Sequence, residues 1–244
     1  MTNTAIDDHL DWPPDGQVFE INHVTLAMNA SDHPFHLANV EAARANWQSA
    51  VAAKPALFDG RMVLFQRLRI GDGQIIGDGH LIPYSTFLLW RRQAQPDCGY
   101  HLFGFAVIMS SDGALIAVQM AEHTANAGLV YCAAGSLDSS DIVDGYVDVE
   151  ANMRREVMEE TGLLLDGAEV DPQLRGFRRG RTVTLFRSFY LKMTAAEIFQ
   201  QIAAHMAVDH EKEIAGPVAI RSADRHAHRF NGAMYPLLDW VFPR

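Results

Sequence analysis

Three glutamates of the chain are spaced so that they fall on one face of a helix. A helix is expected from about Asp148, its N-cap, to Thr161, with Gly162 as the left-handed residue that ends it. At about 100° per residue, Glu156 and Glu160 lie about 40° apart, and Glu159 lies about 60° to the other side of Glu156. Like charges at this spacing destabilise a helix, and a bound divalent cation would reverse that effect. The pattern therefore favours a site for Mg²⁺, or alternatively Mn²⁺, over a solvated acidic face, and Arg155 is placed to form an ion pair with Glu159.

The stretch from Arg155 to Leu163 resembles the second half of the Nudix box, whose pattern is G-x5-E-x7-R-E-U-x-E-E-x-G-U with U apolar. The resemblance covers residues 100–244 and implies an α/β fold, a Nudix α/β/α sandwich around a mixed sheet. It implies an enzyme that hydrolyses the diphosphate of a nucleoside diphosphate linked to another group. The metal ligands that it implies are Glu156, Glu159, Glu160 and the backbone carbonyl of Gly135.

The first half of the Nudix pattern is altered in this chain. Gly135 is followed after five residues by Asp141 instead of Glu, and thirteen residues instead of seven then separate Asp141 from Arg155. A six-residue insertion within the loop 138–148 explains this spacing, and it leaves Val147 where the family has its first Glu. Three aspartates of the loop are candidates to replace that Glu, and the sequence does not choose between Asp141, Asp144 and Asp148.

Hydrolysis also requires a general base and groups that bind phosphate. Glu156 is one candidate base, and the acidic run 209–214, which resembles a later loop of the family, favours Glu213 with Glu211 second. A basic cluster in this acidic protein offers Arg178, Arg179 and Arg181 as phosphate ligands, with Phe177 or Tyr190 stacking on a base; the alternative is a solvated turn.

The rest of the chain divides into four segments by composition and periodicity. These are a loose N-terminal segment (1–17), a small α+β domain (18–92), a linker rich in polar residues (93–99) and the Nudix domain (100–244). In the small domain we expect a strand from Val18 to Met28, a helix that ends at Pro55, and strands over Met62 to Ile70, Gln74 to Leu81 and Tyr84 to Trp90.

Composition excludes several classes of protein. The chain has 244 residues, 48% of them hydrophobic, and a formal charge of −10, which disfavours binding to nucleic acid. Two cysteines are too few for a disulfide framework, and no apolar run approaches the roughly 18–20 residues that span a bilayer. We therefore expect a cytoplasmic protein without a nucleic-acid or membrane partner. The sequence leaves open whether the chain forms a homodimer.

The substrate is constrained only weakly. Residues 54–60, with their Pro-x-Leu-Phe turn, are similar to the N-terminal part of the mammalian Nudix enzyme that hydrolyses UDP-glucose, so a nucleotide sugar or ADP-ribose is expected. Two alternatives are a non-catalytic Nudix-like domain that senses such a ligand, and an isomerase of isoprenoid diphosphates. The isomerase would need a thiol, and nothing in the sequence singles out Cys98 or Cys132 for that work.

Overall fold

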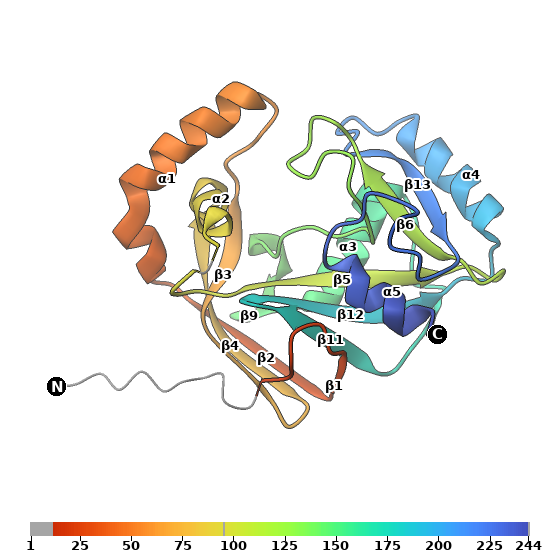
Figure 1. The fold of residues 1–244 in the computed structure, drawn as a ribbon, viewed down its shortest axis with the longest axis horizontal. Helices are drawn as coiled ribbons and strands as arrows, with labels where there is room; N and C mark the ends of the chain where they lie inside the picture. Colours follow the sequence, from red (N-terminus) through yellow and green to blue (C-terminus); the bar gives the residue numbers. More distant parts are fainter. Residues whose placement is uncertain (1–11, 95, 244) are drawn as a thin grey trace.

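The computed structural model describes residues 12–94 and 96–243, which form two mixed β-sheets and five α-helices (Figure 1). In the larger sheet β12 and β5 are parallel neighbours, whereas the other pairs are antiparallel. Its main order is β1 (Phe19–Ile21), β11 (Leu174–Arg179), β12 (Thr182–Tyr190), β5 (His101–Met109), β6 (Leu115–Met120) and β13 (Ile214–Ile220), with β10 (Glu169–Val170) paired to β12 and β7 (Val130–Tyr131) paired to β6.

Helices cover both faces of the larger sheet. On one face α3 (Val149–Thr161) approaches β5 so closely that a Cβ on Gly104 would overlap Met153. On the other face lies α5 (Met234–Val241), whose Trp240 ring packs edge-on against Phe186 of β12 at 5.0 Å between centroids. The helix α4 (Ala195–Met206) packs against β13 and beside the end of α3. The expected α/β class, with helices on both sides of a mixed sheet, is confirmed.

The smaller sheet has the order β3 (Arg61–Gly71), β4 (Gln74–Pro83), β2 (His23–Asn29), β9 (Tyr146–Val147) and β8 (Ile142–Val143), and β2 runs parallel to β4. Two helices, α1 (Pro34–Ala53) and α2 (Tyr84–Arg92), pack beside it. A second hydrophobic cluster, formed by Phe35, Met62, Leu64, Ile82, Phe87 and Trp90, joins them to β3 and β4. None of the described helices is long and apolar enough to cross a membrane.

The two sheets exchange strands across the expected domain boundary. The short strand β1 belongs to the N-terminal segment but pairs with β11 of the larger sheet. The hairpin β8–β9 belongs to the C-terminal segment but pairs with β2 of the smaller sheet, through Ala27 and Tyr146. One hydrophobic core therefore runs through both sheets. Of the segment expected to be loose, residues 1–11 lie outside the described part, and residues 12–16 lie along β11, where Gly16 N–H donates to the carbonyl of Arg178 at 2.8 Å.

The expectation of a strand from Tyr84 to Trp90 is wrong, because this segment forms α2. The extended backbone of Pro83 ends β4, and the carboxylate of the distant Asp59 accepts a hydrogen bond from the backbone N–H of Ser85 at 2.7 Å, which satisfies a free donor of the first turn. Because Phe87 and Trp90 are three residues apart in the helix, they lie on the same helix face and both pack in the second hydrophobic cluster. Their rings stack there with 5.8 Å between the centroids.

Candidate metal and active site

The glutamates lie on α3, whose ends form as the sequence indicates. The Asp148 side chain accepts a hydrogen bond from the backbone N–H of Ala151 at 2.9 Å, and Gly162 ends the helix with φ = 69°. At Gly162 the His205 ring of α4 leaves no room for a Cβ, so both the backbone angle and the packing require glycine. Asp148 therefore caps the helix and is not the loop aspartate that pairs with Arg155.

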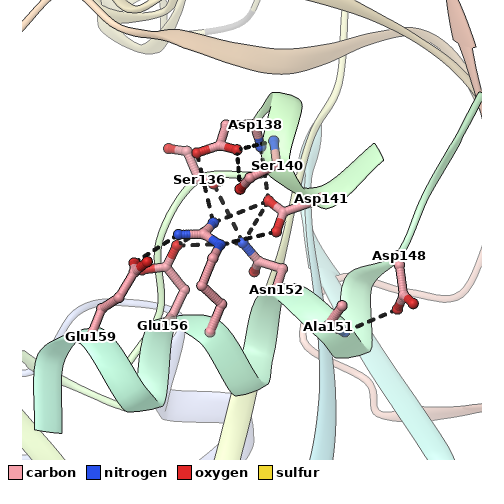
Figure 2. A network of polar contacts seen from close by, with 10 residues as sticks. Ser136, Asp138, Ser140, Asp141, Asp148, Ala151, Asn152, Glu156 and Glu159 are labelled. Atoms are coloured by element: carbon pink, nitrogen blue, oxygen red, sulfur yellow. Dashed lines mark hydrogen bonds and ion pairs between the residues drawn. The ribbon is translucent and has the colours of Figure 1, made fainter. Parts of the chain in front are cut away.

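The guanidinium of Arg155 is the centre of a network that contains the buried acids Asp141 and Glu156 and the exposed Glu159 (Figure 2). Its Nη2 lies 3.1 Å from Oδ2 of Asp141 and 2.8 Å from Oε1 of Glu156, and its Nη1 lies 2.8 Å from Oε2 of Glu159. Asp141 is 2% exposed and also accepts hydrogen bonds from Asn152 Nδ2 and from the backbone N–H of Asp138. The structure thus selects Asp141, one of three aspartates left open by the sequence, as the carboxylate that holds Arg155.

The insertion in the Nudix-like loop forms the β8–β9 hairpin. Residues 142–147 cross to the smaller sheet and return, so Asp141 and Asp148 are brought together at the base of the hairpin, where the Asp148 N–H donates to the Asp141 carbonyl at 2.8 Å. Asp144 occupies the turn with φ = 51° and is exposed. The extra residues therefore attach the helix to the smaller sheet without moving Asp141 away from Arg155.

The three glutamates of α3 differ in their surroundings. Glu156 is 8% exposed and Glu160 is 4% exposed, whereas Glu159 is exposed to solvent. Burial raises the pKa of Glu156 to about 8 even though Arg155 opposes the shift. Burial, reinforced by Glu156, raises the pKa of Glu160 well above its usual value, and Oε2 of Glu160 is buried without a hydrogen-bond partner among the described residues.

Gly135 lies directly against the Glu156 side chain. A Cβ at this position would overlap both carboxylate oxygens of Glu156, so only glycine lets the loop approach the helix so closely. The structure thus brings Gly135 to the glutamates, and the assignment of its carbonyl as a metal ligand stays a prediction.

A cavity of about 340 Å³ opens above these side chains. Both halves of the chain form its walls: Phe58, Gly60, Arg61, Met62 and Tyr84 on one side, and Gly135, Ser136, Asp138, Arg155, Glu156, Glu159, Glu160, Asp209, Glu211 and Glu213 on the other. All three candidate bases, Glu156, Glu211 and Glu213, line this cavity. Partial burial and the neighbouring Glu211 raise the pKa of Glu213, which interacts electrostatically with both Glu156 and Glu160.

Within residues 12–94 and 96–243, no three acidic, histidine or cysteine side chains are arranged to hold a metal ion. In this arrangement the Arg155 guanidinium is the counter-charge for Glu156 and Glu159. The donor set nevertheless fits a hard divalent cation. The unpartnered oxygen of Glu160, the buried carboxyl of Glu156 and the nearby Glu213 are oxygen donors whose mutual repulsion a cation would relieve.

The three arginines predicted to bind phosphate point in different directions. Arg178 pairs with Asp15 at 2.5 Å and donates to the carbonyl of Pro13, and Arg181 lies over the Tyr100 ring and donates to the carbonyl of Asp97. Alternation along β11 places Arg179 on the opposite face of the sheet from Arg178. Of the three, only Arg179 lines a cavity that adjoins Gly135 and Ser136.

The side chains considered for stacking or for thiol chemistry lie elsewhere. Phe177 is fully buried against Phe186, and Tyr190 is at the far end of β12, where it pairs with Glu169 of β10. Neither cysteine lines the cavity with the glutamates. Burial raises the pKa of the Cys98 thiol to about 11, so neither the position nor the ionisation of this thiol supports the isomerase alternative.

A larger cavity, of about 590 Å³, lies between β2, the hairpin β8–β9 and the start of α3. Its charged side chains are already engaged, since Asp148 caps α3 and Arg187 pairs with Glu150 at 3.2 Å. The smaller cavity above Glu156 and Glu160 is therefore the better candidate for chemistry.

Solved structures similar to this one have low identity to the chain. The MutT protein from Methanosarcina mazei Go1 is 16% identical with a TM-score of 0.38, and the match covers 61% of this chain and 95% of that chain. DR0079 from Deinococcus radiodurans is 14% identical with a TM-score of 0.47, over 75% and 99% of the two chains. The Nudix domain of NrtR from Shewanella oneidensis, complexed with ADP ribose, is 16% identical with a TM-score of 0.38, over 62% and 88%.

No family model matches the sequence, and no curated protein matches it. The resemblance to the Nudix family therefore rests on the residues of α3 and of the loop before it. In the structure these residues lie together around Arg155.

Proposed function

We propose that the protein is a Nudix-type hydrolase that requires Mg²⁺, or Mn²⁺ in its place, and cleaves the diphosphate of a nucleoside diphosphate linked to another group. The products would be a mononucleotide and a phosphorylated second product. One observation carries the proposal: α3, fixed by the Arg155–Asp141 ion pair, presents the buried carboxyls of Glu156 and Glu160 at the base of a cavity. Buried acids with raised pKa values in a cavity are typical of functional sites.

The residues that would hold the metal are Glu156, Glu159 and Glu160, together with the carbonyl of Gly135. When bound, Mg²⁺ would neutralise charge on the diphosphate and lower the pKa of a water molecule. Release of Glu156 and Glu159 from Arg155 would make their oxygens available, and Asp141 would keep the guanidinium in place. Arg155 therefore acts as a positioning residue.

The attacking water must lose a proton, and Glu213 is our first candidate to accept it. Its raised pKa, caused by partial burial and by Glu211, makes it a better proton acceptor near neutral pH than an ordinary glutamate. Its position is fixed through the main chain, because the Ala121 N–H donates to the Glu213 carbonyl at 2.8 Å. Glu211 is the second candidate, and Glu156 is the third.

A nucleotide sugar or ADP-ribose fits this cavity better than a nucleoside triphosphate. Of the aspartates in the loop 138–148, only Asp138 lines the cavity, since Asp141 is paired with Arg155, Asp144 lies in the exposed turn and Asp148 caps α3. The acidic side chains Asp209 and Glu211 supply further negative charge at the rim. Repulsion should therefore increase with the charge of the substrate.

The test is a panel of nucleoside diphosphate compounds incubated with the purified chain and Mg²⁺ and scored for release of mononucleotide, with UDP-glucose and ADP-ribose first and triphosphates as comparison. We expect turnover of a diphosphate compound that is lost without divalent metal. Higher kcat/KM for triphosphates would contradict the substrate class. Tight binding of a compound without any hydrolysis would contradict the enzyme and support the alternative of a non-catalytic domain that senses such a ligand.

A further inference from the structure

A second cavity, of about 430 Å³, continues from the first. This cavity and the cavity at the glutamates share Tyr84, Gly135 and Ser136 in their walls. A ligand bound at the glutamates can therefore extend directly into the second cavity. Its size lies within the range of about 300–1,000 Å³ typical of small-molecule sites. The proposed diphosphatase reaction uses only the first cavity, which leaves the second for another part of the substrate.

The wall of the second cavity is aromatic and is built by both halves of the chain. Phe87 of α2 lies 4.6 Å from the ring of His101 on β5, and His101 stacks on Phe103 at 5.2 Å with an angle of 24° between the rings. Burial, and then the charge of Arg91, lower the pKa of His101 to about 3, so its ring is neutral at physiological pH. A neutral aromatic wall of this kind suits a planar ring that stacks on it.

Two guanidinium groups complete the second cavity. Arg179 lies in the same row of the larger sheet as Thr182 and His101, and its guanidinium makes no hydrogen bond or ion pair with the described residues. Its guanidinium contacts the backbone at Gly232, where a Cβ would overlap Nη1. Among the described residues, the guanidinium of Arg91 on α2 donates only to Asn126 Oδ1, at 3.4 Å. A cation without an acidic partner, beside an aromatic wall, fits an anionic group joined to a planar ring.

We infer that the second cavity binds the nucleoside monophosphate half of the substrate, with the base on the wall formed by Phe87, His101 and Phe103 and with Arg179 on the phosphate next to the ribose. This assignment rests on the proposed function for the identity of the substrate. The N-terminal half is then part of the substrate site, because α2 supplies Phe87 and Arg91. The other substituent of the diphosphate lies in the first cavity, beside Phe58 and Arg61.

Binding of mononucleotides tests this inference without any turnover. Titration calorimetry of the full chain, without divalent metal, measures the affinity for UMP and AMP, and ribose 5-phosphate serves as the matched probe that lacks a base. The variants are Arg179→Gln and Phe103→Leu. The control is Arg69→Gln, an exposed arginine of β3 that lines neither cavity. Melting temperatures show whether each variant is folded.

We expect at least one mononucleotide to bind more tightly than ribose 5-phosphate. Arg179→Gln should raise the Kd of that mononucleotide by about tenfold or more, the usual cost of one hydrogen bond to a charged group. Phe103→Leu should also raise this Kd, whereas Arg69→Gln should leave it unchanged. Equal binding of ribose 5-phosphate, or unchanged Kd values in both cavity variants, overturns the inference. Binding that depends on Arg179 in a protein that hydrolyses no compound of the panel supports the cavity assignment and overturns the proposed hydrolase. Hydrolysis with unchanged mononucleotide binding in both variants supports the proposed hydrolase and overturns the cavity assignment.

Discussion

Glu160 combines burial, a raised pKa and an oxygen without a hydrogen-bond partner, so it tests the metal assignment most directly. The raised pKa favours the protonated, neutral form of this carboxyl in the folded, metal-free protein, and glutamine imitates that form. Glu160→Gln should therefore reduce turnover at least about tenfold through loss of a metal charge, while the melting temperature stays the same or rises. Kinetics at saturating Mg²⁺ and thermal denaturation check this.

The matched control is Glu169→Gln, which changes an exposed glutamate on β10. It should leave both activity and melting temperature unchanged. More than a tenth of wild-type turnover in Glu160→Gln, with an unchanged melting temperature, would show that Glu160 does not bind the metal.

Gly135 allows a second test at the level of a single residue. Gly135→Ala should displace the Glu156 carboxylate, because the new Cβ would occupy the position of its oxygens. We expect a clear loss of kcat, measured with the preferred substrate at saturating Mg²⁺. Gly167→Ala is the control, since a Cβ there meets open space and its backbone has no positive φ. Equal activity in the two variants would show that the loop at Gly135 does not position Glu156.

At the scale of elements, the question is what attaches the loop to α3. The buried Asp141 accepts hydrogen bonds from Arg155, Asn152 and the Asp138 main chain, whereas Asp144 lies in the exposed turn of the same loop. Asp141→Asn replaces an acceptor by a donor beside a guanidinium, so it should reduce the free energy of unfolding by about 1–3 kcal/mol. Asp144→Asn should change it by less than about 0.5 kcal/mol, because asparagine tolerates the left-handed turn.

Urea denaturation of the two variants measures this difference, and turnover of Asp141→Asn should fall together with its stability. A larger loss in Asp144→Asn would contradict the assignment of Asp141 as the partner of Arg155. It would favour a role for the hairpin turn in joining the two sheets.

For the whole molecule, buried histidines and buried glutamates make the stability depend on pH in opposite senses. Burial lowers the pKa of His33 to about 4 and that of His101 to about 3, so both are neutral when folded, and their contribution to stability is lost as the pH falls below their unfolded pKa of about 6.5. Burial raises the pKa of Glu156 to about 8, so the folded state holds a proton that the unfolded state has released. Stability should therefore also fall as the pH rises from about 6.5 to 8.5, by about 2 kcal/mol.

Divalent metal should remove the alkaline part of this profile, because it binds the ionised carboxylates of the folded state. Melting temperatures should therefore rise more with Mg²⁺ at pH 8.5 than at pH 6.5. The shift should vanish in the double variant Glu156→Gln, Glu160→Gln. An equal shift in the wild type and the double variant would place the metal elsewhere, with the aspartates of loop 138–148 as the next candidates.

The sequence by itself determined the local features around α3. The N-cap Asp148, the C-terminal Gly162 and the carboxylates one turn apart depend on residues within a few positions of one another, and the structure has them as expected. The capping box of α4, in which Thr194 and Glu197 bond reciprocally, is another local feature of this kind. Helical periodicity and caps act over one or two turns, so they can be read without knowledge of distant residues.

The tertiary structure decided the features that depend on distant partners. The helix at Tyr84 is started by Asp59, and Asp141 becomes the partner of Arg155 because the hairpin β8–β9 pairs with a strand more than a hundred residues earlier in the chain. Burial, which sets the protonation of Glu156 and Glu160, results from packing that involves both sheets. The second cavity joins α2 to β5 and β11. Such contacts form only when the chain closes on itself, so no local pattern in the sequence encodes them.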